Sequence, residues 1–266
     1  MNLSQSQKMS VIVPIFNEER QLREVLQRFF TSTCPIEREW ILINDCSTDR
    51  TAEILVDIAK NHPVVVVHQP VNRGKGAALR EGIRRATGDI IMFQDADFEY
   101  DPRDIPALLD PLLRDEADVV YGSRFKSGSY QVHRTYHYFV NRLLTFLSNL
   151  LSGIYLTDME TCFKLFRADL LKSMNLRSNR FGVEIELTAY VAKTAARVFE
   201  LPISYYPRTR LQGKKITWKD GIAALFHLVR FNTWVRSEDA FSALPPNYSV
   251  WSGQSQIRRH VFKEAE

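Results

Sequence analysis

Short runs of β-branched and other apolar residues alternate with helical patterns along the first half of the chain, and this alternation restricts the fold most. The runs that predict strands are short and bounded by turn residues: 9–14, 40–44, 64–68, 90–94 and 119–121. Apolar residues at helical spacing predict helices between them, at 18–30, 51–60 and 74–86. Strands that are apolar on both faces and joined by helices indicate an α/β fold with a mostly parallel central sheet.

The pattern changes after Gly122. Helices are predicted at 134–151, 181–195 and 218–235, and strands at 161–167 and 197–204. The residues from 237 onward lack periodicity. We therefore expect one domain over residues 1–236 that ends in a helical elaboration, followed by an irregular tail over 237–266.

Composition excludes several classes of protein. With 45% hydrophobic and 25% charged residues the chain is globular, and a net charge of +4 is too small to indicate a nucleic-acid partner. The three cysteines are widely separated and form no disulfide framework or zinc pattern, which favours a reduced cytoplasmic setting. The first ten residues lack an apolar signal-peptide core, and no run approaches the roughly 20 apolar residues that span a bilayer. We expect a cytoplasmic protein, soluble or peripheral on the inner face of a membrane.

Three carboxylates follow the fourth predicted strand. Asp95, Asp97 and Glu99 occupy alternate positions, so in an extended segment they share one side. Ligands of open α/β sheets bind at the carboxyl ends of the strands. These carboxylates repel one another unless a cation lies between them, and their oxygens suit Mg²⁺ or Mn²⁺ beside substrate phosphates. The sequence thus predicts a metal that neutralises a diphosphate leaving group, with Asp97 as a catalytic residue. A solvated acidic turn is the alternative.

The ends of other strands carry groups that suit a nucleotide. Phe16 can stack on a base and Glu18 can accept from ribose hydroxyls, while Asn17 can cap the next helix. Asp45 can accept a hydrogen bond from a nucleobase ring N–H. Lys75 stands between two glycines at a predicted helix start, which suits a diphosphate, although such glycines also serve helix–strand packing. No Walker A or GxGxxG sequence occurs, which disfavours an NTPase or a dinucleotide-binding oxidoreductase.

Taken in order, the motifs resemble the inverting family 2 glycosyltransferases of the GT-A fold, and most closely the dolichyl-phosphate mannose synthase branch. The matching segments are 11–19, 43–51, 72–79, 94–102, 121–125, 158–167, 181–186, 202–205 and 208–218. The resemblance implies a GT-A glycosyltransferase domain at 1–236. It also implies transfer of a hexose from a nucleotide-diphosphate sugar, of the GDP-mannose or UDP-glucose type, to a polyprenyl (dolichyl or undecaprenyl) phosphate.

The same resemblance implies a role for individual residues of the donor site. The residues implied to line the nucleoside pocket are Pro14, Phe16, Glu18, Ile43 and Asp45. Those implied to meet the donor diphosphate and metal are Asp95, Ala96 and Asp97. The basic residues implied near the donor phosphates or sugar are Arg124, Arg208 and Lys214, with Lys215 as the alternative to Lys214.

Two classes of acceptor remain open. A polyprenyl phosphate is anionic at neutral pH, since a phosphate monoester has a second pKa of about 6, and it attacks without a base. Arg124 and Arg134 are the candidate ligands of that acceptor phosphate. A hydroxyl on a glycan, glycolipid or small metabolite needs a carboxylate base, for which Asp158 and Glu160 are candidates unless they cap a turn. A non-catalytic nucleotide-sugar binding protein is a third alternative, against which the acidic set argues.

The helices predicted at 134–151 and 218–235 offer apolar and aromatic faces with basic ends, which suit a membrane surface or a membrane protein. Core packing or a dimer interface explains each helix equally well, so an oligomer stays open. Some apolar residues of the second helix are too crowded for one narrow core stripe: Phe226, Leu228, Val229, Phe231 and Trp234. That crowding favours a partner or a bilayer surface.

Overall fold

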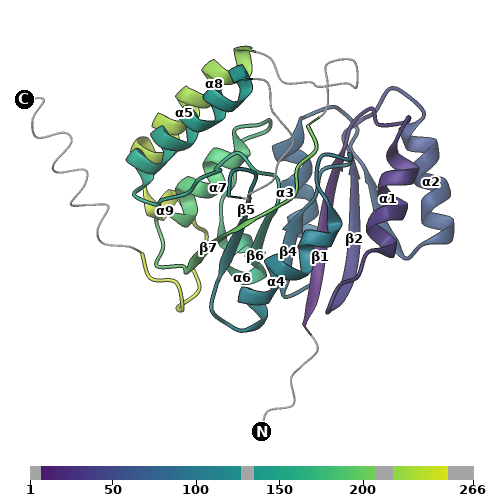
Figure 1. Cartoon of the computed structure of the whole chain (residues 1–266), viewed down its shortest axis with the longest axis horizontal. Coiled ribbons are helices and arrows are strands. Elements are labelled where there is room, and N and C mark those ends of the chain that lie inside the picture. The colour runs from purple at the N-terminus through teal and green to yellow at the C-terminus, as the bar shows by residue number, and fades with distance from the viewer. Residues whose placement is uncertain (1–6, 127–134, 208–217, 251–266) are drawn as a thin grey trace, which may run out of the picture.

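Seven strands form one sheet in the order β3-β2-β1-β4-β6-β5-β7 (Figure 1). The structure, a computed structural model, describes residues 7–126, 135–207 and 218–250. The strands are β1 (Lys8–Ile15), β2 (Glu37–Asn44), β3 (Val64–His68), β4 (Ile90–Phe93), β5 (Val119–Ser123), β6 (Lys164–Arg167) and β7 (Val198–Pro202). β6 runs antiparallel to β4 and β5, and the other neighbouring pairs are parallel. The predicted α/β fold with a mostly parallel sheet is confirmed.

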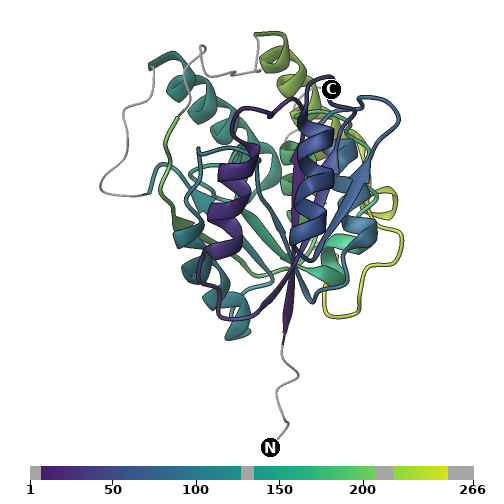
Figure 2. The ribbon, with the colours of Figure 1, turned by 90° about the vertical axis from the view of Figure 1, so that its right-hand side faces the viewer.

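Helices pack on both faces of the sheet (Figure 2). They are α1 (Leu22–Thr31), α2 (Thr51–Asn61), α3 (Lys75–Arg85), α4 (Ile105–Leu113), α5 (Thr135–Ser152), α6 (Ala168–Ser173), α7 (Val183–Val191), α8 (Trp218–Val229) and α9 (Ser237–Ala240), with a 3₁₀ turn η1 (Pro102–Asp104) and a π-helix η3 (Arg230–Trp234). α3 lies against β1 and β2, and α5, α7 and α8 contact one another as a helical elaboration. Within the described ranges, each helix is too short or too polar to cross a bilayer.

The central strands are buried on both sides, as their apolar composition predicts. Every residue of β4 is buried, and Val11, Ile12 and Val13 of β1 have no exposed surface. α3 approaches β1 most closely at Gly82, where an added Cβ would lie 2.3 Å from Ile12 Cγ2. Glycine is required there because any side chain would overlap the strand. The close packing holds α3 firmly beside the strands whose ends carry the acidic residues.

The segment after α8 and η3 begins with the short helix α9 and has no further helix or strand among the described residues. The side chains of Phe241 and Tyr248 are buried, so residues 237–250 pack on the preceding part of the chain. The predicted division at residue 236 stays a prediction. The apolar residues of this segment lack periodic spacing because they meet several different elements, and such contacts leave no local pattern. Residues 251–266 lie outside the described part of the chain.

Candidate donor-binding site

The predicted donor-site residues follow strands whose carboxyl ends meet at one edge of the sheet. β1 is parallel to both β2 and β4, so the segments after Ile15, Asn44 and Phe93 begin side by side. The turn before α3 reaches the same edge, where Asn72 Nδ2 donates to the Asp45 backbone carbonyl over 3.1 Å. The topology thus gathers residues that are far apart in the chain.

Asp45, predicted to accept a hydrogen bond from a nucleobase, holds the turn that opens α3. Its Oδ1 accepts from the Arg73 backbone N–H over 2.9 Å, and its Oδ2 accepts from the Gly74 N–H over 2.7 Å. Gly74 has a φ of 91°, a conformation that glycine adopts readily and other residues do not. The Asp45 side chain is buried. It lies directly after β2, and its partners are backbone groups of the chain itself, so its bond to a nucleobase stays a prediction.

The loop after β1 is tied to the loop after β2. The Glu18 N–H donates to Thr51 Oγ1 over 2.9 Å, and Glu18 Oε2 accepts from Gln21 Nε2 over 2.6 Å. Asn17 does not cap α1, the alternative considered for it. Its Oδ1 accepts from the Thr48 N–H over 2.8 Å. These bonds fix the backbone on either side of Phe16 and Glu18, the two side chains predicted to meet the nucleoside.

The other predicted nucleoside residues differ in exposure. Pro14 and Phe16 are partly exposed, whereas Ile43 has no exposed surface and Ala96 is buried. Ile43 pairs with Pro14 inside the sheet and faces the core. A side chain so placed supports the wall of a pocket from behind, and the contact of Ile43 with a nucleoside stays a prediction.

Lys75 forms two ion pairs at the start of α3. Its Nζ lies 2.9 Å from Asp95 Oδ1 and 2.9 Å from Glu184 Oε1, and the three side chains are largely buried. Burial alone would lower the pKa of the Lys75 ammonium, but Asp95 and Glu184 raise it well above its ordinary value. Lys75 is therefore a fixed positive charge beside Asp95. Sequence reasoning missed Glu184, although it lies in the motif at 181–186.

The three predicted metal ligands do not form one cluster. Asp97 is buried and its Oδ1 accepts from the Glu99 backbone N–H over 2.9 Å, whereas Glu99 Oε2 accepts from Tyr205 Oη over 2.8 Å. Among the described residues, no three His, Cys, Asp or Glu side chains are grouped to hold a metal ion. The side chains of residues 95–99 do not alternate as predicted, because β4 ends at Phe93 and the chain bends after Asp95. Asp95 and Asp97 remain at the strand end as the acidic pair.

Arg124 and Asp158 form a buried two-pronged ion pair. Arg124 Nε donates to Asp158 Oδ2 and Arg124 Nη2 to Asp158 Oδ1, each over 2.7 Å, and the Arg124 backbone N–H donates to Oδ2 over 3.0 Å. The guanidinium also lies 5.1 Å from the ring centroid of Tyr205. Burial would lower the pKa of Arg124, but Asp158 raises it well above its ordinary value. This arrangement does not suit Asp158 as a base, since both of its oxygens already bind Arg124.

Glu160 is the second predicted base and has a different environment. Its Oε1 is buried and has no hydrogen-bond partner among the described residues. Burial and the nearby Glu184 carboxylate raise the pKa of Glu160 to about 7. The pKa of the neighbouring Lys164 is lowered by burial. A carboxyl group with such a pKa can exchange a proton near neutral pH, as a general base must.

Three predicted ligands of phosphate or sugar cannot be placed. Arg134, Arg208 and Lys214 lie outside the described residues, as does Lys215. Tyr205 was not predicted as a site residue, although the motif at 202–205 includes it. Its hydroxyl binds Glu99 and its ring faces the Arg124 guanidinium, so it connects the acidic strand end with the Arg124–Asp158 pair.

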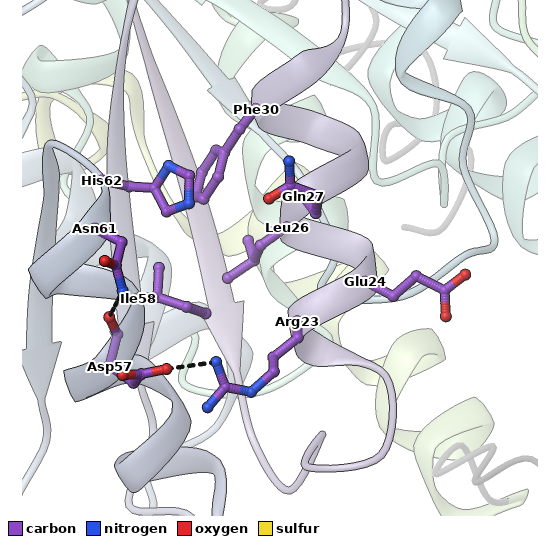
Figure 3. A pocket seen from close by; sticks show the side chains of 9 residues that line it. All are labelled: Arg23, Glu24, Leu26, Gln27, Phe30, Asp57, Ile58, Asn61 and His62. Carbon is purple, nitrogen blue, oxygen red and sulfur yellow. Dashed lines mark hydrogen bonds and ion pairs between the residues drawn. The ribbon is translucent and has the colours of Figure 1, made fainter.

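Two surface hollows flank α1. Figure 3 shows a groove of about 400 Å³ between α1 and α2, in which the side chains of Phe30 and His62 face each other and an Arg23–Asp57 ion pair closes one end over 2.6 Å. A second hollow, on the other side of α1, is lined in part by Phe98 and Tyr206. The groove of Figure 3 contains none of the predicted donor ligands, whereas the second hollow borders the acidic strand end.

A sequence profile described as "Glycosyl transferase family 2" matches residues 10–174. Dolichol-phosphate mannosyltransferase of Pyrococcus furiosus is 26% identical over 230 residues, which cover 85% of this chain and 64% of that protein. Dodecaprenyl-phosphate galacturonate synthase of Rhizobium johnstonii is 30% identical over 219 residues, 77% of this chain and 60% of that protein. The chain thus spans less than two thirds of the length of these two relatives.

Undecaprenyl-phosphate mannosyltransferase of Micrococcus luteus is 29% identical over 206 residues, 74% of this chain and 83% of that protein. Glucosyl-3-phosphoglycerate synthase of Mycobacterium tuberculosis, crystallised with Mn²⁺, uridine diphosphate and phosphoglyceric acid, superposes with a TM-score of 0.66. It is 20% identical and the match covers 92% of this chain and 87% of that one, so it bears on the fold alone. On the profile match and this shared GT-A architecture, the chain belongs to glycosyl transferase family 2 and is a glycosyltransferase.

Proposed function

We propose that this glycosyltransferase moves a hexose, with inversion, from a nucleotide-diphosphate sugar to a polyprenyl phosphate. The observation that carries the proposal is the Asp95–Asp97 pair after β4, next to Lys75 in a family 2 fold. Tyr205 connects the neighbouring Glu99 with the Arg124 guanidinium. The names of the relatives support lipid phosphates as acceptors, with dolichyl or undecaprenyl phosphate as examples. The donor is of the GDP-mannose or UDP-glucose type.

The acidic pair suits a divalent ion of the Mg²⁺ or Mn²⁺ type. Mg²⁺ in proteins is commonly bound by one or two carboxylates together with substrate phosphates, so a third protein ligand is not needed. Asp95 and Asp97 provide these hard oxygen donors, whereas Glu99 binds Tyr205. When bound, such an ion supplies positive charge beside the leaving diphosphate.

The side chains around the acidic pair orient the donor. Lys75 keeps Asp95 in place and adds positive charge at the strand end. Arg124 is held by Asp158 and by the ring of Tyr205, so its position is fixed before a substrate arrives. A guanidinium fixed in this way costs little further ordering when an anion binds near it. We propose that it contributes to the field that attracts the donor and acceptor phosphates.

The contacts of Asp158 support a phosphate acceptor rather than a hydroxyl acceptor. An anionic phosphate attacks the anomeric carbon without losing a proton, and Asp158, one of the two predicted bases, is bound on both oxygens by Arg124. The test is release of nucleoside diphosphate from GDP-mannose and UDP-glucose, with polyprenyl phosphates or hydroxyl acceptors. Transfer to the lipid phosphate and not to hydroxyl compounds is expected, and the reverse preference would overturn the proposal.

Glu160 favours a second candidate function, transfer to a hydroxyl group, because it is a carboxyl with a pKa of about 7 and a buried oxygen without a partner among the described residues. If the acceptor is a phosphate, Glu160→Gln should keep most of the activity. If the acceptor is a hydroxyl, kcat/KM of the wild type should rise with pH through about 7, as Glu160 loses its proton, and Glu160→Gln should abolish this rise. The pH profiles of both proteins distinguish the two acceptors.

Lys75→Met should change the binding of metal and nucleotide in opposite directions. Removal of the ammonium leaves Asp95 without its counter-charge, so Mn²⁺ alone should bind about tenfold more tightly, the size expected for one lost charge nearby. Binding of GDP or UDP without metal should weaken by a similar factor, because a cation near the diphosphate is gone. Calorimetric titrations with each ligand measure both effects.

Glu184→Gln is the matched control, since it removes the other partner of Lys75 and leaves the ammonium to Asp95 alone. Mn²⁺ should then bind more weakly than in the wild type. A Lys75→Met protein that binds both ligands more weakly would show that Lys75 only supports the fold.

Because the proposed acceptor is a lipid, we also propose that the protein works on the cytoplasmic side, peripherally on the inner face of a membrane.

A further inference from the structure

α5 exposes one row of large apolar residues and buries small polar residues together with Leu144 on another side. Phe139, Leu143, Phe146 and Leu150 are 63%, 56%, 62% and 65% exposed. They follow one another at three- and four-residue intervals, so they form a row along one side of the helix. The buried side includes Leu144, Thr145 and the nearby Ser148 and Ser152, and Leu147 and Leu151 pack partly buried against the core. The helix is therefore apolar on its exposed side as well, unlike a helix whose outer side meets water.

The neighbouring helix continues the exposed apolar surface. α5 packs against α8, and Figures 1 and 2 both show the two side by side. Phe226 of α8 is 51% exposed and Trp234 of η3 is 63% exposed, and their rings lie 5.8 Å apart. Leu228 and Phe231 of the same segment are buried and already fill the core beneath it, so Phe226 and Trp234 are not needed there. We call Phe139, Leu143, Phe146, Leu150, Phe226 and Trp234 the apolar face.

The helices that carry the apolar face have more cations than carboxylates. The 18 residues of α5 include Arg142 and no Asp or Glu, and α8 with η3 includes Lys219 and Arg230 together with Asp220, whereas Arg236 lies 3.8 Å from Glu238. Two copies of such a face would set more cations than carboxylates against each other, which does not favour a dimer. Aromatic and aliphatic side chains beside arginines match the interface of a bilayer that contains anionic lipids.

The apolar face is connected to the candidate site. The rings of Phe125 and Tyr138 pack edge to face 5.4 Å apart, and Arg142 Nη1 donates to the Thr157 carbonyl over 3.2 Å. Phe125 follows Arg124 directly, and Thr157 precedes Asp158. The first half of α5 thus touches both segments that form the buried ion pair. A surface that holds α5 would also hold the Arg124–Asp158 pair close to it.

We infer that the apolar face lies on an anionic lipid bilayer, with α5 and α8 in the headgroup region and the Arg124–Asp158 pair close to the lipid phosphates. The inference rests on the proposed function, because a lipid acceptor is the reason for the protein to meet a membrane. It adds the surface that makes the contact. Vesicle binding and sugar transfer are separate measurements, so the two can fail independently.

The test is sedimentation of the full chain with phosphatidylcholine vesicles, with and without phosphatidylglycerol. The wild type should bind the anionic vesicles at least tenfold more tightly than the neutral ones, and the Phe146→Glu/Leu150→Glu variant should lose at least tenfold in that binding. The matched control is Val56→Glu/Val71→Glu, two residues that are 51% and 52% exposed in another part of the surface and should leave binding unchanged. Melting temperatures equal to that of the wild type confirm that the variants fold.

Several outcomes would overturn the inference. The first is wild-type protein that stays in solution with both kinds of vesicle. The second is a glutamate variant that binds the anionic vesicles as well as the wild type does. The third is a wild-type protein that is a dimer in light scattering and a variant that is a monomer, with no vesicle binding by either. The last result would assign the apolar face to a second copy of the chain. Vesicle binding without any sugar transfer would instead contradict the proposed function and leave the membrane contact intact.

Discussion

Asp97→Ala is expected to lower the rate of sugar transfer by at least about 10²-fold, the effect of removing one group that stabilises the charge developing on a leaving group. Asp97 is buried shortly after the end of β4. The loss should come mainly from a weaker response to Mg²⁺ or Mn²⁺. Initial rates of nucleoside diphosphate release over a range of metal concentrations measure it.

Glu99→Gln is the matched control for that experiment. Glu99 accepts a hydrogen bond from Tyr205, and a glutamine oxygen can accept the same bond. If the metal is held by Asp95 and Asp97, this variant should keep its activity within a few-fold. A large loss in Glu99→Gln would restore the three-carboxylate ligand set, and an unaffected Asp97→Ala would end the metal hypothesis.

Asp158→Asn is expected to lower the free energy of unfolding by about 3–5 kcal/mol, because it leaves the buried Arg124 guanidinium without its counter-charge. Arg124 and Asp158 are 7% and 0% exposed, so water cannot replace the lost charge. For a chain of this length the midpoint of thermal unfolding should fall by about 10 °C. Calorimetry and urea unfolding measure the change.

Asp115→Asn is the control for a surface pair. Asp115 Oδ1 accepts from both Arg167 and Arg197 over 3.0 Å, but its side chain is 77% exposed, so its loss should cost about 1 kcal/mol or less. Equal losses in the two variants would mean that burial does not strengthen the Arg124–Asp158 pair. An Asp158→Asn protein that is active and as stable as the wild type would also contradict the proposal that Asp158 holds Arg124 in place.

Part of the candidate site follows from the sequence because it depends on where strands end. Asp45 directly follows β2 and Asp95 comes shortly after β4, and both strands have a clear apolar pattern. Parallel strands end at the same edge of the sheet. Their presence at the site was therefore predicted. Their partners were not, since Lys75 reaches Glu184 across more than a hundred residues, and a contact of that kind leaves no periodic signal in the chain.

The prediction for Glu99 shows the limit of a local rule. Alternation of side chains holds while the backbone stays extended, and β4 ends at Phe93 before the acidic residues begin. The bend that follows turns Glu99 toward Tyr205, a residue that β7 carries to this edge. No feature of residues 95–99 by themselves predicts that bend.

The alternation of apolar runs and helical patterns determined the α/β class, the parallel strands and the edge at which chemistry occurs, because each depends on side chains close together in the chain. The antiparallel insertion of β6 between β4 and β5, the Lys75 and Arg124 ion pairs and the outward row on α5 were decided only by the tertiary structure. These features depend on which distant segments come into contact. Burial and charge pairing belong to the folded chain as a whole, and a local pattern does not contain them.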